Sequence, residues 1–169
     1  VPRVDRPAAA GAIVVGTPST SPLVAALGWT DALARLGDEG YVIRTTTVAG
    51  LSATVVASTG EAGALYGAFH LLRLIQTRQP VDSLDLTSVP KVKLRMLNHW
   101  DNLNRTVERG YSGQSIFDWW RLPGHVDPRL VDYARANASI GINGTVLNNV
   151  NAKADSLTPP FIAKAAAVA

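Results

Sequence analysis

The sequence predicts an α/β protein whose N-terminal half has an α+β arrangement of helices packed on a sheet. Two alternating, β-branched segments at residues 41–48 and 51–58 precede a long amphipathic segment at residues 58–78. Farther along the chain, two short apolar segments at residues 91–100 and 142–150 flank a segment with helical start and stop signals. The second pattern is typical of a parallel strand–helix–strand unit.

The N-terminal elements begin with a short apolar strand and an amphipathic segment. Residues 11–16, GAIVVG, form a continuous apolar run of strand length. Residues 28–40, GWTDALARLGDEG, form the amphipathic segment, which Gly37 and Gly40 bring to an end. The two alternating segments then follow with only an Ala-Gly connection between them, so the pair predicts a β-hairpin.

The long amphipathic segment carries the clearest helix signals of the chain. Ser58 or Thr59 is expected to cap its N-terminus, and Glu61 lies in the first turn, where the helix dipole favours a negative charge. Gly63 and Gly67 each cost about 1 kcal/mol relative to alanine inside a helix, so together they predict a close approach of the sheet backbone. Four apolar side chains share one helical face and are expected to face the core: Leu65, Phe69, Leu72 and Ile75.

A polar segment bounded by prolines, residues 80–90, predicts a linker between two domains. We expect an α+β accessory domain at residues 1–90 and a second domain at residues 91–169. In the second domain Asp127-Pro128 and Thr158-Pro159 are helix start signals. The first of these helices has an apolar stripe and ends at a glycine: Leu130, Tyr133, Ala134, Ala138 and then Gly141. A parallel strand–helix–strand unit is the building block of a (β/α) barrel or of a doubly wound sheet.

Amides and an aspartate follow both predicted strands of the second domain. Residues 98–102, Asn-His-Trp-Asp-Asn, end the first strand, and residues 148–151, Asn-Asn-Val-Asn, end the second. The carboxyl ends of parallel strands face the same way, so these side chains are expected on one rim, suited to a polyhydroxylated ligand. The alternative is that the asparagines are turn residues and helix caps.

The loop at residues 99–120, HWDNLNRTVERGYSGQSIFDWW, concentrates aromatic and charged side chains. Arg109 offers a planar fork for a carboxylate or for vicinal hydroxyls, and Glu108 is expected to accept from sugar hydroxyls or to hold Arg109. The alternative is a structural Glu108–Arg109 network that fastens the loop. Trp119 and Trp120 form a sugar-pocket wall or pack the loop on its own domain, and Asp101 orients Arg109 or caps a turn.

Composition excludes several other classes of function. With Lys+Arg 16 against Asp+Glu 13, the formal charge of +3 is too small and too scattered to indicate nucleic-acid binding. The chain has no cysteine, and its three histidines lack ligand spacing, so we expect no metal and no cofactor. No apolar stretch is long enough to span a bilayer, and a cytoplasmic, periplasmic or secreted location stays open.

Three segments carry a resemblance to a known family. KLRMLNHWDNLNRTVERGYSGQSIFDWW, YARANASIGING and TVLNNVNA are similar to the opening of the catalytic barrel of α-glucuronidases of glycoside hydrolase family 67. EGYVIRT and STGEAGALYGAFHLLRLIQ resemble the accessory N-terminal domain of the same family, although β-hexosaminidases carry a similar domain. Asn104 stands where the family pattern has an acidic residue.

The resemblance implies an enzyme that hydrolyses the α-1,2 bond of glucuronic or 4-O-methylglucuronic acid side groups on xylo-oligosaccharides, with inversion. It implies that the second domain is the start of a (β/α)₈ barrel, which needs roughly 250 residues, so the chain is expected to be an inactive, truncated piece. No catalytic acid or base is expected within it, and a homodimer is expected of the full-length enzyme. The expected substrate-binding residues are Trp100, Asp101, Asn102, Glu108, Arg109, Trp119, Trp120, Asn148, Asn149 and Asn151. Two alternatives stay open: a non-catalytic carbohydrate-binding protein and a hexosaminidase-like glycosidase.

Overall fold

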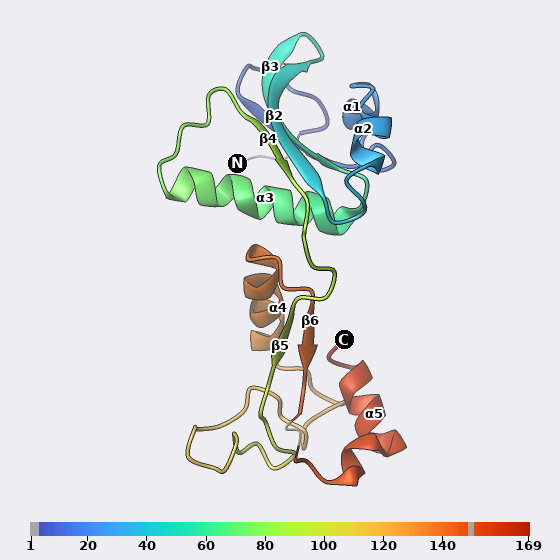
Figure 1. Cartoon of the computed structure of the whole chain (residues 1–169), viewed down its shortest axis with the longest axis vertical. Helices are drawn as coiled ribbons and strands as arrows, with labels where there is room; N and C mark the ends of the chain where they lie inside the picture. The colour runs from blue at the N-terminus through green and yellow to red at the C-terminus, as the bar shows by residue number, and fades with distance from the viewer. Residues whose placement is uncertain (1–3, 149–150) are drawn as a thin grey trace. The chain divides into compact units, whose positions relative to one another are not determined.

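The computed structural model describes residues 4–148 and 151–169. The chain forms two compact units, unit 1 ending at Lys93 and unit 2 beginning at Leu94. Each unit contains strands and helices (Figure 1), which confirms the predicted mixed α/β class. None of the helices in the described ranges is long and apolar enough to cross a bilayer.

Unit 1 is built on a four-stranded sheet with the order β1-β3-β2-β4. Its strands are β1 (Ala12–Gly16), β2 (Tyr41–Val48), β3 (Leu51–Ser58) and β4 (Asp85–Ser88). Strand β1 runs parallel to β3, whereas β2 pairs antiparallel with both β3 and β4. Ala49 and Gly50 connect β2 to β3 with positive φ angles of 49° and 84°, as tight hairpin turns require. The predicted hairpin is therefore confirmed.

Three helices cover the two faces of this sheet (Figure 1): α1 (Pro22–Ala25), α2 (Thr30–Ala34) and α3 (Glu61–Gln76). On one face, Val24 of α1 and Leu33 of α2 pack in a cluster with Val55 of β3. On the other face, Leu71 of α3 packs with Val56, the next residue of the same strand. Successive side chains of a strand point to opposite faces, so β3 contributes to both layers of the core.

The segment predicted to be a linker contains a strand. β4 lies inside residues 80–90 and adds to the edge of the sheet beside β2. Leu84 just before it is 8% exposed, and its backbone N–H donates to the Thr45 hydroxyl at 2.9 Å. Asp85 forms an ion pair with Arg44 of β2 at 2.6 Å. These cross-strand contacts hold the segment in unit 1, so the linker prediction is wrong for most of its length.

Helix α3 packs on the sheet with a different face from the one predicted. The buried positions are Gly63, Ala64, Gly67 and Leu71. Leu65, Leu72 and Ile75, which were expected in the core, are 47%, 50% and 46% exposed. The side with the smallest residues faces the sheet because it allows the closest approach, as the two glycines predicted. A Cβ at Gly67 would lie only 2.5 Å from Cγ1 of Val56.

The start of α3 also differs from the prediction. Gly60 is the N-cap residue, and no side chain caps the helix there. The Ser58 hydroxyl instead donates to the carbonyl oxygen of Gly40 at 2.6 Å and is fully buried. Ser58 therefore fastens the loop before β2 to the end of β3.

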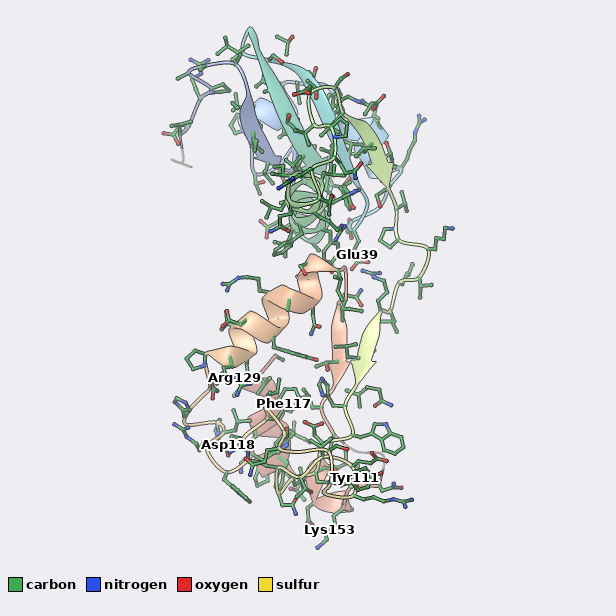
Figure 2. All side chains as sticks on the ribbon, turned by 90° about the vertical axis from the view of Figure 1, so that its left-hand side faces the viewer. Glu39, Tyr111, Phe117, Asp118, Arg129 and Lys153 are labelled. Atoms are coloured by element: carbon green, nitrogen blue, oxygen red, sulfur yellow. The ribbon has the colours of Figure 1, made fainter. Side chains whose placement is uncertain are left out.

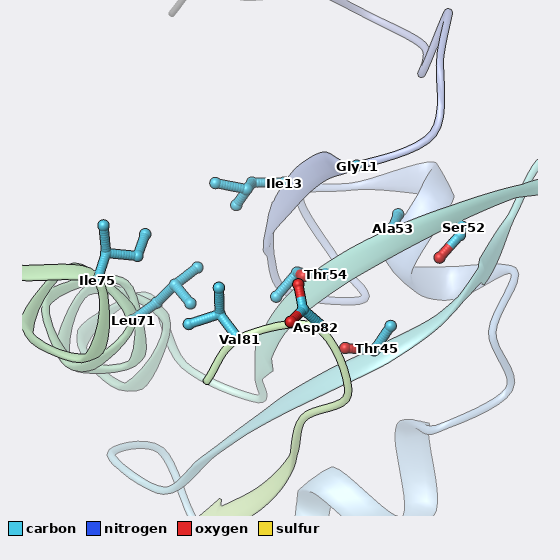
Figure 3. A pocket seen from close by; sticks show the side chains of 10 residues that line it. All are labelled: Gly11, Ile13, Thr45, Ser52, Ala53, Thr54, Leu71, Ile75, Val81 and Asp82. Atoms are coloured by element: carbon cyan, nitrogen blue, oxygen red, sulfur yellow. The ribbon is translucent and has the colours of Figure 1, made fainter. Parts of the chain in front are cut away.

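A groove of about 360 Å³ opens in unit 1 beside α3 (Figure 3). Leu71 and Ile75 of α3 line it together with Ile13 of β1 and with Val81 and Asp82 of the following loop (Figure 3). Because α3 lies over the central strands, the edge strand is left partly uncovered, and Ile13 is 51% exposed.

Unit 2 contains a parallel two-stranded sheet and two α-helices. Its elements are β5 (Met96–Asn98), α4 (Arg129–Ser139), β6 (Gly144–Val146), a 3₁₀-helix η1 (Ala154–Leu157) and α5 (Pro159–Ala166). The parallel pairing of β5 with β6 is as predicted, although each strand has only three residues. Asp127 accepts a hydrogen bond from the Arg129 N–H at 2.9 Å before α4, and Gly141, with φ 79°, follows that helix.

Candidate functional site

The loop of unit 2 leaves β5 with side chains that alternate between the interior and the surface. The N–H of His99 donates to the Val146 carbonyl at 3.0 Å and so extends the contact between the strands. Asp101 is 4% exposed and forms a β-bridge with Val107. Trp100 between them is 42% exposed. The turn at the end of the strand therefore presents Trp100 outward while its neighbours lie inward.

Within the described residues, neither role predicted for Asp101 is seen. Its carboxylate lies 3.6 Å from Nδ1 of His99, rather than against Arg109 or at a helix cap. Nε2 of His99 lies 2.6 Å from the Tyr133 hydroxyl of α4. The His99 ring also packs edge-on against Phe117, which is fully buried. No functional role was predicted for His99, because its contacts with three other side chains could not be read from residue spacing.

An ion pair that was not predicted, between Arg105 and Asp118, fastens the loop. Nη1 of Arg105 lies 3.0 Å from the Asp118 carboxylate, and its Nη2 donates to the Ser115 carbonyl at 3.2 Å. Within residues 4–148 and 151–169, no ion pair joins Glu108 to Arg109, so the predicted structural network between them is not found. The Glu108 carboxylate instead accepts from the Tyr111 hydroxyl, and this hydrogen bond raises the pKa of Tyr111.

Five of the predicted site residues line one cavity of about 610 Å³ in unit 2. They are Asn102, Glu108, Arg109, Trp120 and Asn151. We call this cavity the loop groove. Its other lining residues are Leu103, Asn104, Thr106, Ala152, Lys153, Asp155 and Phe161. Residues 102–109 and 151–155 are far apart in the sequence, and the groove forms because both segments follow adjacent parallel strands.

Two cations and one exposed ring dominate the chemistry of the loop groove. In the part of the chain that the structure describes, neither Arg109 nor Lys153 forms an ion pair. Figure 2 shows Lys153 and Tyr111 at the loop end of unit 2. Trp120 is 69% exposed and offers a face for stacking. An anionic group can bind the cations while an apolar ligand face packs on the indole.

The amide of Asn102 is already committed to the loop. Its Nδ2 donates to the Thr106 hydroxyl at 2.9 Å and to the Glu108 carbonyl at 2.8 Å. Both donors therefore hold the turn that carries Glu108, whose φ of 55° is unusual for a residue other than glycine. Asn102 shapes the loop groove, and only its carbonyl oxygen is left to face a ligand.

The remaining predicted residues lie elsewhere. Trp119 is 4% exposed and packs against Phe161, so it belongs to the core of unit 2, and of its two predicted roles the packing of the loop on its own domain is the one seen. Its neighbour Trp120 is the exposed member of the pair. Trp100, Asp101 and Asn148 are not among the residues that line the loop groove. Asn149 lies outside the described residues.

Lys153 and Asp155 line the loop groove but were not predicted as site residues. Both follow β6 by several residues, on the same side of the sheet as the predicted rim. Their position in the same connection as Asn151 was the available signal. In the described ranges there is no group of three or more histidine, aspartate or glutamate side chains that could hold a metal ion.

Comparison with known proteins identifies the family. Residues 2–71 match the glycosyl hydrolase family 67 N-terminus, and residues 74–169 match the glycosyl hydrolase family 67 middle domain. The chain is 39% identical over 153 residues to alpha-glucuronidase A of Emericella nidulans, which covers 87% of this chain and 17% of that protein. It is 44% identical over 102 residues to the probable alpha-glucuronidase A of Aspergillus terreus, covering 59% of this chain and 12% of the relative.

The matched part of the chain corresponds to 12% of the length of one relative and 17% of the other, which is about an eighth and about a sixth. Each of the two family matches covers a different half of the sequence, and the longer one alone extends over residues 74–169. The chain therefore belongs to glycosyl hydrolase family 67, as the resemblance of its loop and helix motifs predicted.

Proposed function

We propose that this chain is the N-terminal portion of an α-glucuronidase. The complete polypeptide would hydrolyse the α-1,2 bond that joins glucuronic or 4-O-methylglucuronic acid to xylo-oligosaccharides. Membership of glycosyl hydrolase family 67 and the names of its relatives support the reaction. The loop groove supports the substrate class, because Arg109 and Lys153 flank it without ion-pair partners in the described residues.

The composition of the loop groove suits a uronic acid better than a neutral sugar. A guanidinium fork binds a carboxylate through two parallel hydrogen bonds, and an ammonium adds a point charge. Trp120 supplies an apolar face for the C–H groups of a sugar ring. Asn151 and the carboxylate of Asp155 supply groups that exchange hydrogen bonds with hydroxyls. Neutral sugars would leave the two cations without a partner.

We propose that the rim residues after the two strands complete the sugar site. In this proposal Trp100 stacks on the sugar, and Asp101 acts indirectly through His99. Asn148 and Asn149, which follow β6 in the sequence, are also proposed to contact the ligand. The parallel pair β5 and β6 with the intervening α4 supports the proposal that unit 2 opens a (β/α)₈ barrel, in which sites lie at the carboxyl ends of the strands.

The proposed mechanism places no catalytic acid or base in this chain. Inverting glycosidases need two carboxyl groups roughly 6.5–9.5 Å apart, so that the attacking water fits between them. Of the two carboxylates of the loop groove, Glu108 is hydrogen-bonded to Tyr111 and Asp155 lies on the exposed connection after β6. We assign both to substrate orientation, and the acid and base to other parts of the complete polypeptide.

An activity measurement tests the proposal. The complete polypeptide encoded by the gene is incubated with aldouronic acids, and release of glucuronic acid is followed by chromatography. Inversion is checked by NMR, which observes the first-formed anomer. Release of N-acetylhexosamine from a chromogenic hexosaminide, without release of uronic acid, would overturn the proposal in favour of a hexosaminidase.

A second measurement separates catalysis from binding alone. Calorimetry of the complete polypeptide with an aldouronic acid measures affinity whether or not the bond is cleaved. Binding without any hydrolysis would indicate a carbohydrate-binding protein and would contradict the proposed enzyme.

A further inference from the structure

A series of hydrogen-bonding groups begins at His99, the residue before Trp100, and connects three elements of unit 2. Nε2 of His99, at the end of β5, lies 2.6 Å from the hydroxyl oxygen of Tyr133 in α4. That oxygen lies 3.0 Å from Oγ1 of Thr145 in β6. The Thr145 hydroxyl donates to the carbonyl of Leu97 at 3.4 Å, which returns the chain to β5.

The donor is fixed at one end of this series of hydrogen bonds. A carbonyl oxygen can only accept, so the Thr145 hydroxyl is the donor to Leu97. Between Tyr133 and Thr145 either hydroxyl can donate, and between His99 and Tyr133 the donor depends on the tautomer of the imidazole. In either direction the Tyr133 hydroxyl joins His99 to Thr145.

The surroundings of His99 hold its ring in one orientation. Its centroid lies 5.2 Å from that of Phe117 and 5.5 Å from that of Tyr133, both in edge-to-face arrangements. On the other side, the buried Asp101 carboxylate faces Nδ1 at 3.6 Å. With both ring nitrogens and a ring face in contact, rotation of the imidazole would break several contacts at once.

The fixed position of His99 bears directly on Trp100. His99 and Asp101 both point inward, so the residue between them is directed to the surface. The Trp100 carbonyl also accepts from the Glu108 N–H at 2.7 Å, which ties the far side of the loop groove to the same point. A shift of His99 would therefore move Trp100 and the turn that carries Glu108 together.

We propose that His99, Tyr133 and Thr145 are positioning residues that set the indole of Trp100 for sugar stacking, through a hydrogen-bond chain that runs from His99 to the Leu97 carbonyl. This inference rests on the proposed function, because it gives Trp100 a substrate. It adds three residues that contact no substrate themselves. They act by holding the rim of the site in the geometry that the sugar needs.

The test uses Tyr133→Phe in the complete polypeptide. This substitution removes the one hydroxyl that joins His99 to Thr145 and keeps the ring packed against Phe117. We expect the KM for an aldouronic acid to rise about fivefold, as for the loss of one hydrogen bond, with kcat within about twofold. Hydrogen exchange of a peptide covering residues 97–108 is expected to become faster.

Unit 1 offers a matched control, Tyr41→Phe. The Tyr41 hydroxyl lies 3.0 Å from Nδ1 of His70, and the two rings are also edge-on. The same atom is removed from the same kind of tyrosine–histidine pair, outside the site. We expect no change in KM and no change in the exchange of residues 97–108. An equal rise in KM for both variants would overturn the proposal, since it would reflect general destabilisation.

Substitution of His99 tests whether its hydrogen bond to Tyr133 matters. The side-chain amide of His99→Gln can donate to the Tyr133 hydroxyl or accept from it, so its KM is expected to stay within about twofold of the parent, whereas His99→Leu should match Tyr133→Phe. Equal KM values for the Gln and Leu variants would overturn the proposal. If the parent releases no glucuronic acid, the proposed function fails by itself. The exchange of residues 97–108 then still decides the inference, which is overturned if Tyr133→Phe leaves that exchange unchanged.

Discussion

Arg109 and Lys153 offer an anion two different geometries within one groove. The guanidinium is planar and matches both oxygens of a carboxylate, whereas the ammonium is a strongly hydrated point charge on a flexible stem. If a uronate binds in the loop groove, the two residues should therefore differ in how well they tolerate conservative replacement.

Arg109→Lys keeps the charge and removes the fork, and we expect it to raise the KM for an aldouronic acid about tenfold, the effect of losing one charge-assisted hydrogen bond. Lys153→Met keeps the length of the side chain and removes the charge, and we expect a rise of about threefold. Steady-state kinetics of the complete polypeptide measure both.

The matched control for these variants is Arg129→Lys. Arg129 begins α4 in the same unit and does not line the loop groove (Figure 2). Its KM should equal that of the parent. An unchanged KM for Arg109→Lys would show that the Arg109 guanidinium does not bind the substrate carboxylate.

His70 provides a pH-dependent contribution to the stability of unit 1. Burial, with a smaller contribution from the nearby Arg73 charge, lowers the pKa of His70 below its ordinary value of 6.5. The folded state therefore favours the neutral ring, which lies 3.0 Å from the Tyr41 hydroxyl. As pH falls below 6.5, the unfolded chain takes up a proton first, and stability is lost until the pH passes the lowered value.

We expect the melting temperature of unit 1 to fall between pH 7 and pH 5, and to fall less in His70→Gln, which does not titrate. Thermal unfolding followed by circular dichroism at both pH values measures the difference between parent and variant. An equal fall in melting temperature between pH 7 and pH 5 in both proteins would show that other groups cause the acid sensitivity.

At the scale of single elements, α3 shows how backbone approach selects a helix face. A Cβ at Gly63 would lie 2.7 Å from the Gly40 carbonyl oxygen and 2.9 Å from that of Asp38. Both are backbone atoms and cannot rotate away. Glycine has a low helix propensity, but its lack of a Cβ allows α3 to pack closely against the sheet at this position.

Gly63→Ala is expected to destabilise the chain by about 1–3 kcal/mol, because overpacking outweighs the gain in helix propensity of about 1 kcal/mol. Denaturant unfolding measures the change. Ala62→Gly at the neighbouring exposed position is the control, and it should lose about 1 kcal/mol from propensity alone. Stabilisation by Gly63→Ala would contradict the close approach.

At the scale of the whole chain, the two units differ in how well their sheets are supported. β3 is paired on both sides and packed on both faces. β5 has three residues and pairs in the described structure with β6. A short parallel pair with open edges has few cooperative hydrogen bonds.

We expect the amides of β3 in the 169-residue chain to exchange with solvent at least about a hundredfold more slowly than those of β5 and β6. Hydrogen exchange followed by mass spectrometry resolves both segments in one experiment. Equal protection in the three strands would contradict the predicted weakness of the second sheet.

Local signals determined the elements that depend on neighbours in the sequence. The hairpin of β2 and β3 was predicted because its alternation and its turn lie within one short segment. The presence of α4 after Asp127-Pro128 and the parallel pairing across that helix followed from helix-start and chain-direction rules, although Pro128 rather than Asp127 is the N-cap residue. The four-residue helix α1 was missed, because it is too short to show a period.

The sequence by itself thus determined the α/β class, the bounds of the β2–β3 hairpin and, through its loop motifs, the membership of glycosyl hydrolase family 67. Only the tertiary structure decided which face of α3 is buried, that residues 85–88 join the sheet, and that Trp119 lies inside while Trp120 is exposed. It also brought His99 to Tyr133 and Arg109 into one groove with Lys153. Caps and periodicity act over a few residues, whereas burial and partner choice depend on segments that only the folded chain brings together.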